Sequence, residues 1–186
     1  MLLKRVSTAA TTRSSTVRMF ALGIALLAAS AVSVSAQPKI NDAQIAAIAV
    51  AANQVDDAGK LGLSKARNGE IKQFAQTMVT DHGGAIKAAT DLVGKLKVTP
   101  QENDTSKALV TGGQDARAKL AKLDGDAFDK AYVDNEVGYH ETVVKALDDT
   151  LIPNAQNGEL KSLLTSVRRV AAAHLDHARE LQKSLK

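Results

Sequence analysis

The amino-acid sequence predicts an all-α protein in which four antiparallel helices form a bundle and one additional helix connects two of them. Aromatic residues make up only 3% of the 186 residues, and runs of β-branched and aromatic residues, which are typical of strands, are missing. Alanine, leucine and lysine are abundant, which favours helices. Apolar residues recur at spacings of three and four in segments with short connections, and this pattern indicates an antiparallel bundle.

The first 36 residues are predicted to be a cleavable secretory signal. A basic start without acidic residues leads into the apolar segment 21–31, and Val34-Ser35-Ala36 provides small side chains for cleavage before Gln37. The apolar segment is shorter than the about 20 residues that span a bilayer. An uncleaved membrane anchor is the alternative. We therefore expect a mature domain, 37–186, that is periplasmic and has no stable membrane insertion after signal cleavage.

Charge and cysteine content exclude several classes of protein. The chain has 24 Lys and Arg residues against 20 Asp and Glu residues, and four of the basic residues precede Gln37. The predicted mature chain therefore carries no net formal charge. A nucleic-acid-binding domain has a basic stripe of its own, and none is evident, so we expect no nucleic-acid partner. Because the chain has no cysteine, disulfides and a cysteine-linked lipid anchor are excluded.

The apolar periodicity predicts five helices, and turn residues separate them. The helices are expected at about residues 42–67, 70–97, 105–123, 127–151 and 159–185. Asn68-Gly69, Pro100 and the segment from Pro153 to Gly158 mark breaks between them. The segment 105–123 has a thin apolar face, so we expect it to be a crossover or satellite helix. No clear internal repeat is evident.

Three of the predicted helices have a histidine where the apolar series requires a core residue. His82, His140 and His174 each occupy such a position, so we expect all three side chains to point into the bundle. His177 lies beside the series and should be more exposed. Burial disfavours a charged imidazole, and acidification should therefore destabilise the fold.

Acidic residues accompany these histidines. Asp56 lies on the apolar face of the first helix with Asp57 alongside it, and Glu136 lies one turn before His140. Imidazole and carboxylate groups together bind zinc, iron, manganese or copper, so the candidate metal ligands are these three residues and the three histidines. A hydrogen-bonded network of the same side chains is the alternative, because it too satisfies buried imidazole nitrogens.

Depth along the helix axis favours some combinations of these residues over others. Asp56 and His82 are about equally far from the turn that joins their helices. His140 lies 13 residues before Pro153 and His174 lies 21 residues after it, a mismatch of about 12 Å. His82, His140 and an aspartate therefore form a better predicted cluster than all four together.

Sequence signatures of catalysis are missing. Di-iron carboxylate bundles use Glu-x-x-His motifs, and this chain has none. It also has no cysteine nucleophile, no Gly-x-Ser-x-Gly turn, no phosphate-binding glycine loop and no His-Glu-x-x-His motif. We therefore identify no catalytic or cofactor-binding residues, and an activity other than catalysis is favoured.

Several segments resemble an exported bacterial family, domain of unknown function 4142, whose members are often described as predicted outer membrane proteins. The segments that carry the resemblance are Phe74 to His82 (FAQTMVTDH), Phe128 to His140 (FDKAYVDNEVGYH) and His174 to Glu180 (HLDHARE). The similarity extends from about Asn41 to Lys183. It implies a ferritin-like helical bundle in the periplasm or envelope and supplies no activity. Family members usually have a glutamate near the middle of the first helix, which corresponds to Asp57.

Three functions are consistent with the sequence. The first is a non-enzymatic periplasmic bundle that binds a metal through His82, His140 and an aspartate. The second is an envelope-stress or interaction protein whose histidines form a structural network. The third is a metal-dependent oxidoreductase. The metal, a protein partner and the oligomeric state are left open.

Overall fold

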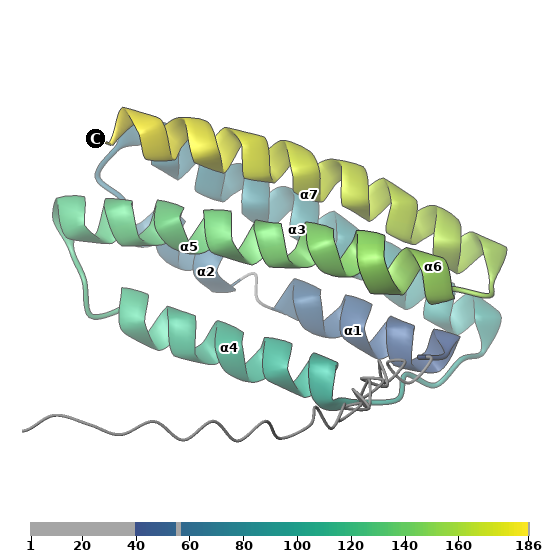
Figure 1. Cartoon of the computed structure of the whole chain (residues 1–186). Coiled ribbons are helices and arrows are strands. Elements are labelled where there is room, and N and C mark those ends of the chain that lie inside the picture. Colours follow the sequence, from purple (N-terminus) through teal and green to yellow (C-terminus); the bar gives the residue numbers. More distant parts are fainter. Residues whose placement is uncertain (1–39, 55–56, 186) are drawn as a thin grey trace, which may run out of the picture. The chain divides into compact units, whose positions relative to one another are not determined.

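Helices account for nearly all of the residues that the computed structural model describes, which are 40–54 and 57–185 (Figure 1). These residues belong to one unit of the chain, Gln37–Lys186. The helices are α1 (Asp42–Gln54), α2 (Asp57–Lys65), α3 (Gly69–Leu96), α4 (Asp104–Leu120), α5 (Gly125–Ala146), the π-helical turn η1 (Leu147–Leu151), α6 (Ile152–Asn154) and α7 (Gly158–Ser184). No strand occurs among them, so the all-α prediction is confirmed. The predicted signal, residues 1–36, lies outside the described residues.

The direction of each helix gives the bundle its ferritin-like connectivity. The pair α1 and α2 covers one length of the bundle, α3 returns, and α5 and α7 form the second hairpin (Figure 1). Because α4 runs back along the bundle between them, α3 and α5 point in the same direction. The packed pairs α2–α3, α3–α7, α5–α7 and α2–α5 are all antiparallel. The predicted four-helix bundle with an additional connecting helix is therefore confirmed.

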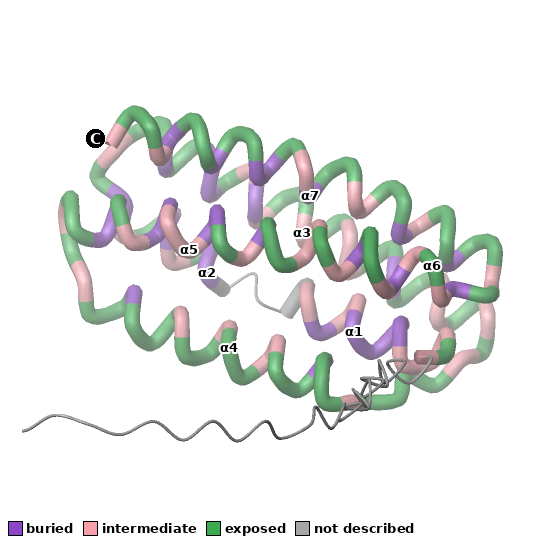
Figure 2. Tube along the Cα trace, viewed as in Figure 1, coloured by how far each residue is buried: buried purple, intermediate pink, exposed green. Residues whose placement is uncertain are grey.

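The connecting helix α4 lies outside the four-helix core. It packs mainly against α1, and among its side chains only Ser106 and Leu120 are buried. Figure 2 shows that most of its surface is exposed, whereas the other long helices have a buried inner face. Asn103 caps the helix, because its side chain accepts a hydrogen bond from the Ser106 backbone N–H. The thin apolar face of this segment thus corresponds to a helix on the outside of the bundle.

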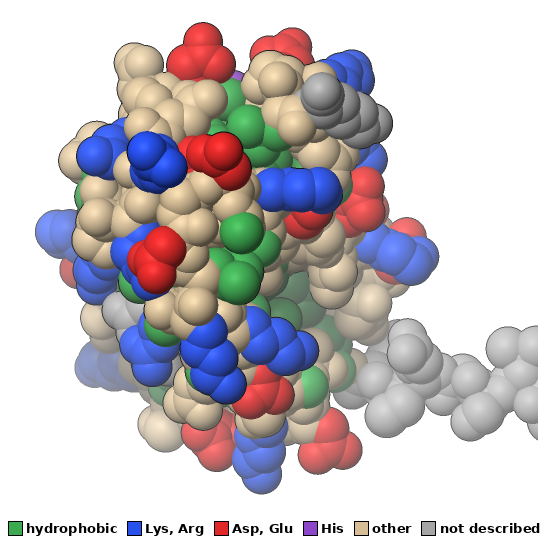
Figure 3. Space-filling model, turned by 90° about the vertical axis from the view of Figure 1, so that its left-hand side faces the viewer, with side chains coloured by type: hydrophobic (Ala, Val, Ile, Leu, Met, Phe, Trp, Pro, Cys, Tyr) green, Lys and Arg blue, Asp and Glu red, His purple; other side chains and the backbone are tan. Residues whose placement is uncertain are grey.

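Surface charges of the two signs lie close together. On the end of the bundle that faces the viewer in Figure 3, acidic and basic side chains are interspersed, with small apolar areas between them. Within the part of the chain that is described, no helix combines the length and the apolar character that crossing a membrane requires.

The two hairpin turns share a short sequence repeat that periodicity alone did not reveal. Residues 68–72 read Asn-Gly-Glu-Ile-Lys and residues 157–161 read Asn-Gly-Glu-Leu-Lys. In each turn the asparagine caps the next helix, because its side-chain oxygen accepts hydrogen bonds from the second and third backbone N–H groups that follow it. The same local chemistry therefore starts α3 and α7.

Each hairpin also holds the turn of the other hairpin through an aspartate. Asp129 of α5 is buried and accepts hydrogen bonds of 2.8–3.3 Å from the backbone N–H groups of Arg67 and Asn68. Asp42 of α1 accepts bonds of 2.8 and 2.9 Å from the equivalent N–H groups of residues 156 and 157. Charge-assisted bonds of this kind are about twice as strong as neutral ones. This reciprocal anchoring fixes the two hairpins against each other at both ends.

The helix predicted to end at about Leu151, before the break at Pro153, continues through the proline. The five residues of η1 form a wider, π-helical turn directly before α6, and Pro153 lies within α6. A proline inside a regular α-helix clashes with the carbonyl group four residues earlier, and a local π-turn is one way in which helices change their hydrogen bonding. The chain therefore turns at 155–157 and not at the proline.

The apolar core consists of two separate clusters along the bundle. One contains Phe74 and Tyr132 and lies toward the turn between α2 and α3. The other contains Ile45 and Leu147 and lies toward the turn between α6 and α7. The residues that lie between the two clusters are those of the candidate site.

Close packing in the first cluster depends on Gly62 of α2. A Cβ atom at this position would lie 2.8 Å from Cζ of Tyr132 and 2.9 Å from Cβ of Ala75, which is too close for either contact. The glycine therefore lets α2 approach α3 and α5 directly. Gly138, in the middle of α5, has open space at the same place.

We predict that Gly62→Ala lowers the free energy of unfolding by about 1–3 kcal/mol, because overpacking outweighs the gain in helix propensity. Gly138→Ala is the matched control and should raise it by about 0.5–1 kcal/mol, since nothing obstructs its methyl group. Urea denaturation followed by circular dichroism measures both. A Gly62→Ala protein as stable as the wild type would contradict the close packing of α2 against α3 and α5.

Candidate metal centre

Three histidines from three helices meet between the two apolar clusters. His82 lies on α3, His140 on α5 and His174 on α7, and one ring nitrogen from each lies within 4.8 Å of those of the other two. Their ring centroids are 5.3–5.7 Å apart. His140 is 1% exposed and His174 is 5% exposed, whereas His82 is half-buried. All three therefore point inward, as the apolar periodicity predicted.

The prediction that His174 lies about 12 Å from His140 along the helix axis was wrong. It placed the turn at Pro153, but the helix continues to Asn154 and the next helix begins at Gly158. His140 lies 14 residues before the first of these ends and His174 lies 16 residues after the second. The two histidines are therefore at nearly the same depth, and His174 belongs to the cluster.

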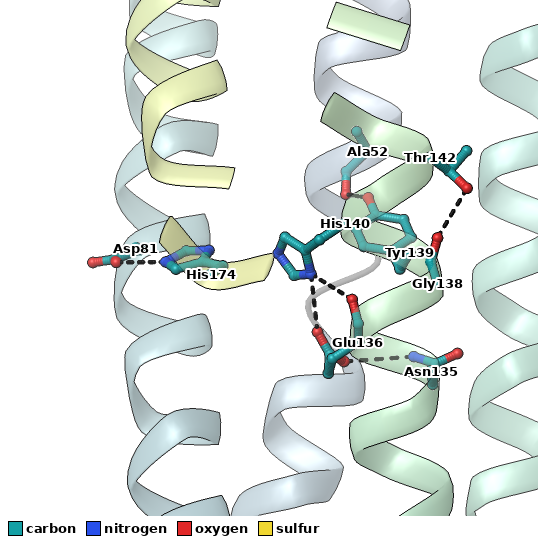
Figure 4. Close-up of polar contacts among 9 residues, drawn as sticks. All are labelled: Ala52, Asp81, Asn135, Glu136, Gly138, Tyr139, His140, Thr142 and His174. Atoms are coloured by element: carbon teal, nitrogen blue, oxygen red, sulfur yellow. Dashed lines mark hydrogen bonds and ion pairs between the residues drawn. The ribbon is translucent and has the colours of Figure 1, made fainter. Parts of the chain in front are cut away.

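Hydrogen bonds to the outer ring nitrogens fix the tautomers of two of these histidines. Nε2 of His174 lies 2.9 Å from Oδ2 of Asp81, and Nδ1 of His140 lies 2.9 Å from the backbone oxygen of Glu136 (Figure 4). A carboxylate and a carbonyl oxygen only accept hydrogen bonds, so these nitrogens donate. In a neutral ring the other nitrogen then has a free lone pair. Those atoms are Nδ1 of His174 and Nε2 of His140.

These two inward nitrogens are buried and make no hydrogen bond with any of the described residues. A buried polar atom without a partner costs about 1–3 kcal/mol, so each such atom calls for a partner. Two lone pairs from different helices that converge at one point can accept a metal ion or a hydrogen-bond donor.

The Glu136 carboxylate lies beside Nδ1 of His140 and therefore on the opposite side of that ring from the inward Nε2. Its side chain is buried, and Oε2 is 3.6 Å from Nδ1 of His140, the nitrogen that already donates to the Glu136 backbone. Tyr139, which directly precedes His140, donates a hydrogen bond of 2.6 Å to the backbone oxygen of Ala52 (Figure 4). Burial, with the nearby Glu136 charge, raises the pKa of the Tyr139 phenol. Glu136 therefore orients His140 in this structure.

The other predicted metal ligands are Asp56 and Asp57. Asp56 lies outside the described residues, and so does the side chain of Asp57, the first residue of α2. Their assignment as metal ligands stays a prediction. His177 is exposed, as expected, and its ring packs edge-on against Phe74 at a centroid distance of 5.0 Å.

Asp81 is a site residue that the sequence reasoning missed. It directly precedes His82, but its carboxylate binds His174 on the neighbouring helix α7. Because adjacent residues of a helix point in directions about 100° apart, Asp81 lies off the apolar series and faces the seam between α3 and α7. An acidic residue beside a core histidine was the available signal, and carboxylate–histidine pairs are the usual outer partners of metal ligands.

Desolvation lowers the pKa of two of the three histidines. Burial lowers the pKa of His82 to about 4, and the neighbouring His174 adds to this effect while Asp81 opposes it. Burial likewise lowers the pKa of His140 to about 4, against the hydrogen bond to the Glu136 backbone. Both imidazoles are therefore neutral at neutral pH, which is the form that binds a metal.

We predict that stability falls as the pH is lowered from about 6.5 to about 4 and then levels off, as far as these histidines contribute. Over this range His82 and His140 are protonated in the unfolded chain but stay neutral in the folded protein. A histidine whose pKa is lowered from 6.5 to about 4 reduces the free energy of unfolding by on the order of 3 kcal/mol once the pH is below about 4. Urea denaturation at a series of pH values measures the slope.

The histidine contribution is isolated by comparison with variants. His140→Gln should flatten the slope, whereas His177→Gln should leave it unchanged, because His177 is exposed. Equal slopes for the wild type and His140→Gln would show that the histidines titrate normally.

Comparison with known proteins gives two matches. The chain matches the model of a family described as "Domain of unknown function (DUF4142)" over residues 27–181. None of the curated proteins compared with the chain matches it. A solved structure described as "CopM in the Cu(II)-bound form" is similar, with a TM-score of 0.61 and 19% identity, over 78% of this chain and 98% of that chain. At this identity the likeness shows a shared fold. The family match spans most of the sequence, and the chain therefore belongs to the DUF4142 family.

Proposed function

We propose that the protein is an exported, periplasmic helical bundle that binds a divalent transition-metal ion through His82, His140 and His174. The observation that carries this proposal is the pair of inward lone pairs on His140 and His174, which the outer hydrogen bonds to Glu136 and Asp81 set in place. Three ligand atoms within 4.8 Å of one another fit a single ion with a small adjustment of rotamers.

The donor set favours particular metals. Imidazole nitrogen suits copper and zinc, and of the divalent first-row ions copper(II) binds such sites most tightly. The chain offers no thiolate, so a soft-ion site for copper(I) is not supported by cysteine. The protein of similar fold is described in a Cu(II)-bound form, which supports copper(II) as the first ion to test. Zinc, iron and manganese are the comparison ions.

Binding, and not catalysis, is the role that this geometry supports best. Three protein ligands leave a coordination position for a further group, so the donor count alone does not separate a carrier from an enzyme. The described part of the chain adds no cysteine and no Glu-x-x-His pair beside the histidines. The rival function, a structural histidine network, predicts the same outer hydrogen bonds without an ion.

We predict that the purified domain, residues 37–186, binds one equivalent of copper(II) and gains about 5–10 °C in melting temperature when the free ion is at a hundred times its Kd. Adding a strong chelator at neutral pH should reverse the gain. His140→Ala should show neither effect, because it removes an inward nitrogen. Elemental mass spectrometry and thermal denaturation measure them. A wild type that binds no stoichiometric ion and gains no stability from any of the four metals would leave the structural network as the function.

The outer carboxylate gives a second test. Asp81→Asn should weaken metal affinity by about 10- to 100-fold, because the aspartate fixes the tautomer of His174 and raises its basicity. Asp91→Asn is the matched control on the same helix, since Asp91 is exposed and forms its ion pair with Lys87, away from the histidines. Competition titration with a chelator of known affinity measures both. Equal loss in the two variants would indicate a general electrostatic effect and no specific role for Asp81.

A further inference from the structure

A cavity of about 480 Å³ extends from the histidines toward the turn between α6 and α7. Its volume is within the range of about 300–1,000 Å³ that is typical of small-molecule sites. On α7 its lining runs from Leu163 to His174, a length of about 16 Å along the helix axis. The cavity is therefore long enough for an extended chain.

Small side chains create this space. Ala85 and Ala89 of α3, Ala146 of α5 and Ala171 of α7 line the cavity at positions where a bundle core usually has larger residues. Protein interiors are normally as densely packed as organic crystals. A cavity of this size between the helices therefore arises from these alanines, and the packing of the two apolar clusters does not account for it.

The lining is polar at one end and mainly apolar at the other, where Thr105 and Ser166 also line it. Asp81 and the three histidines lie at the first end, and Asp81 is the only acidic side chain among the described residues of the lining. Leu147, Leu151 and Leu164 line the other end. A molecule with a small polar head and an apolar chain matches this division.

The head group must donate a hydrogen bond and carry no charge. When their rings are neutral, Nε2 of His140 and Nδ1 of His174 hold lone pairs and therefore accept. A carboxylate head has no proton to offer them and would approach the negative charge of Asp81. A buried ammonium head would lose its hydration, which is costly without a closely paired charge.

We propose that this cavity binds a neutral single-chain amphiphile, a primary alcohol in chemical class, with its hydroxyl at His140 and His174 and its alkyl chain along Leu147, Leu151 and Leu164. The ligand enters where exposed residues line the cavity, at Ala88 of α3 and at Val170 of α7, which is 43% exposed. The proposal concerns the metal-free protein, so it does not rest on the proposed metal site.

The test uses the metal-free domain, residues 37–186, a fluorescent apolar dye that binds in the cavity, and 1-decanol as the competing probe. We expect 1-decanol to displace the dye. Its methyl ether should bind about fivefold more weakly, because it has the same chain and no hydrogen to donate. Decanoate should bind more weakly than the alcohol.

Two cavity-filling variants locate the site. Ala171→Leu and Ala146→Leu should each weaken 1-decanol binding by about tenfold or more, because their added atoms occupy the space of the chain. Ala173→Leu is the matched control on α7, since Ala173 is exposed and outside the lining. Circular dichroism shows whether each variant is folded. The two cavity-filling substitutions lie on different helices, so one variant still tests the site if the other does not fold.

The proposal is overturned if the wild type binds no 1-decanol, if a folded filler variant binds it as tightly as the wild type, or if decanoate binds more tightly than the alcohol. Loss of copper binding in the same protein would not bear on these results, because no metal is present. Conversely, 1-decanol binding with no copper binding would remove the proposed metal function and leave the cavity as a ligand site.

Discussion

The structure depends on the burial of three imidazoles in one layer of the bundle. Desolvation there opposes protonation, and each ring still needs partners for its nitrogens. The Asp81 carboxylate and the Glu136 backbone oxygen accept hydrogen bonds from the outer nitrogens of two rings, so the other nitrogen of each ring is left for the interior. The apolar core is divided in two by this layer, with a cluster on each side. The candidate site is thus a consequence of how the fold accommodates polar groups in its interior.

The metal ion and the amphiphile would use the same lone pairs in different ways. An ion would draw the three rings together at the polar end, whereas an alcohol would place its hydroxyl there and fill the apolar end with its chain. The alanines that line the cavity matter only for the second ligand, and His82 matters more for the first. The two ligands would therefore share His140 and His174 and differ in the other residues on which they depend.

Periodicity predicted the helices and the inward direction of the histidines because both follow from local geometry. Three- and four-residue spacing determines which face of a helix is buried, and this holds for His82, His140 and His174. Depth depends on where the chain actually turns, and the π-helical turn carried the helix past Pro153. Asp81 was missed for a related reason: its partner is on another helix, and one-dimensional spacing contains no information about contacts between helices.

The reciprocal anchoring of the two turns has a consequence for how many ligands a site in this fold can have. Repeated Asn-Gly-Glu turns, each held by an aspartate of the other hairpin, make the scaffold nearly twofold. A true symmetric dimer of hairpins would supply every side chain twice, so its midline would hold ligands in even numbers. A single chain is free of that restriction. Here one hairpin contributes one histidine and the other contributes two. A nearly twofold scaffold therefore surrounds a set of three donors, which two identical halves could not provide.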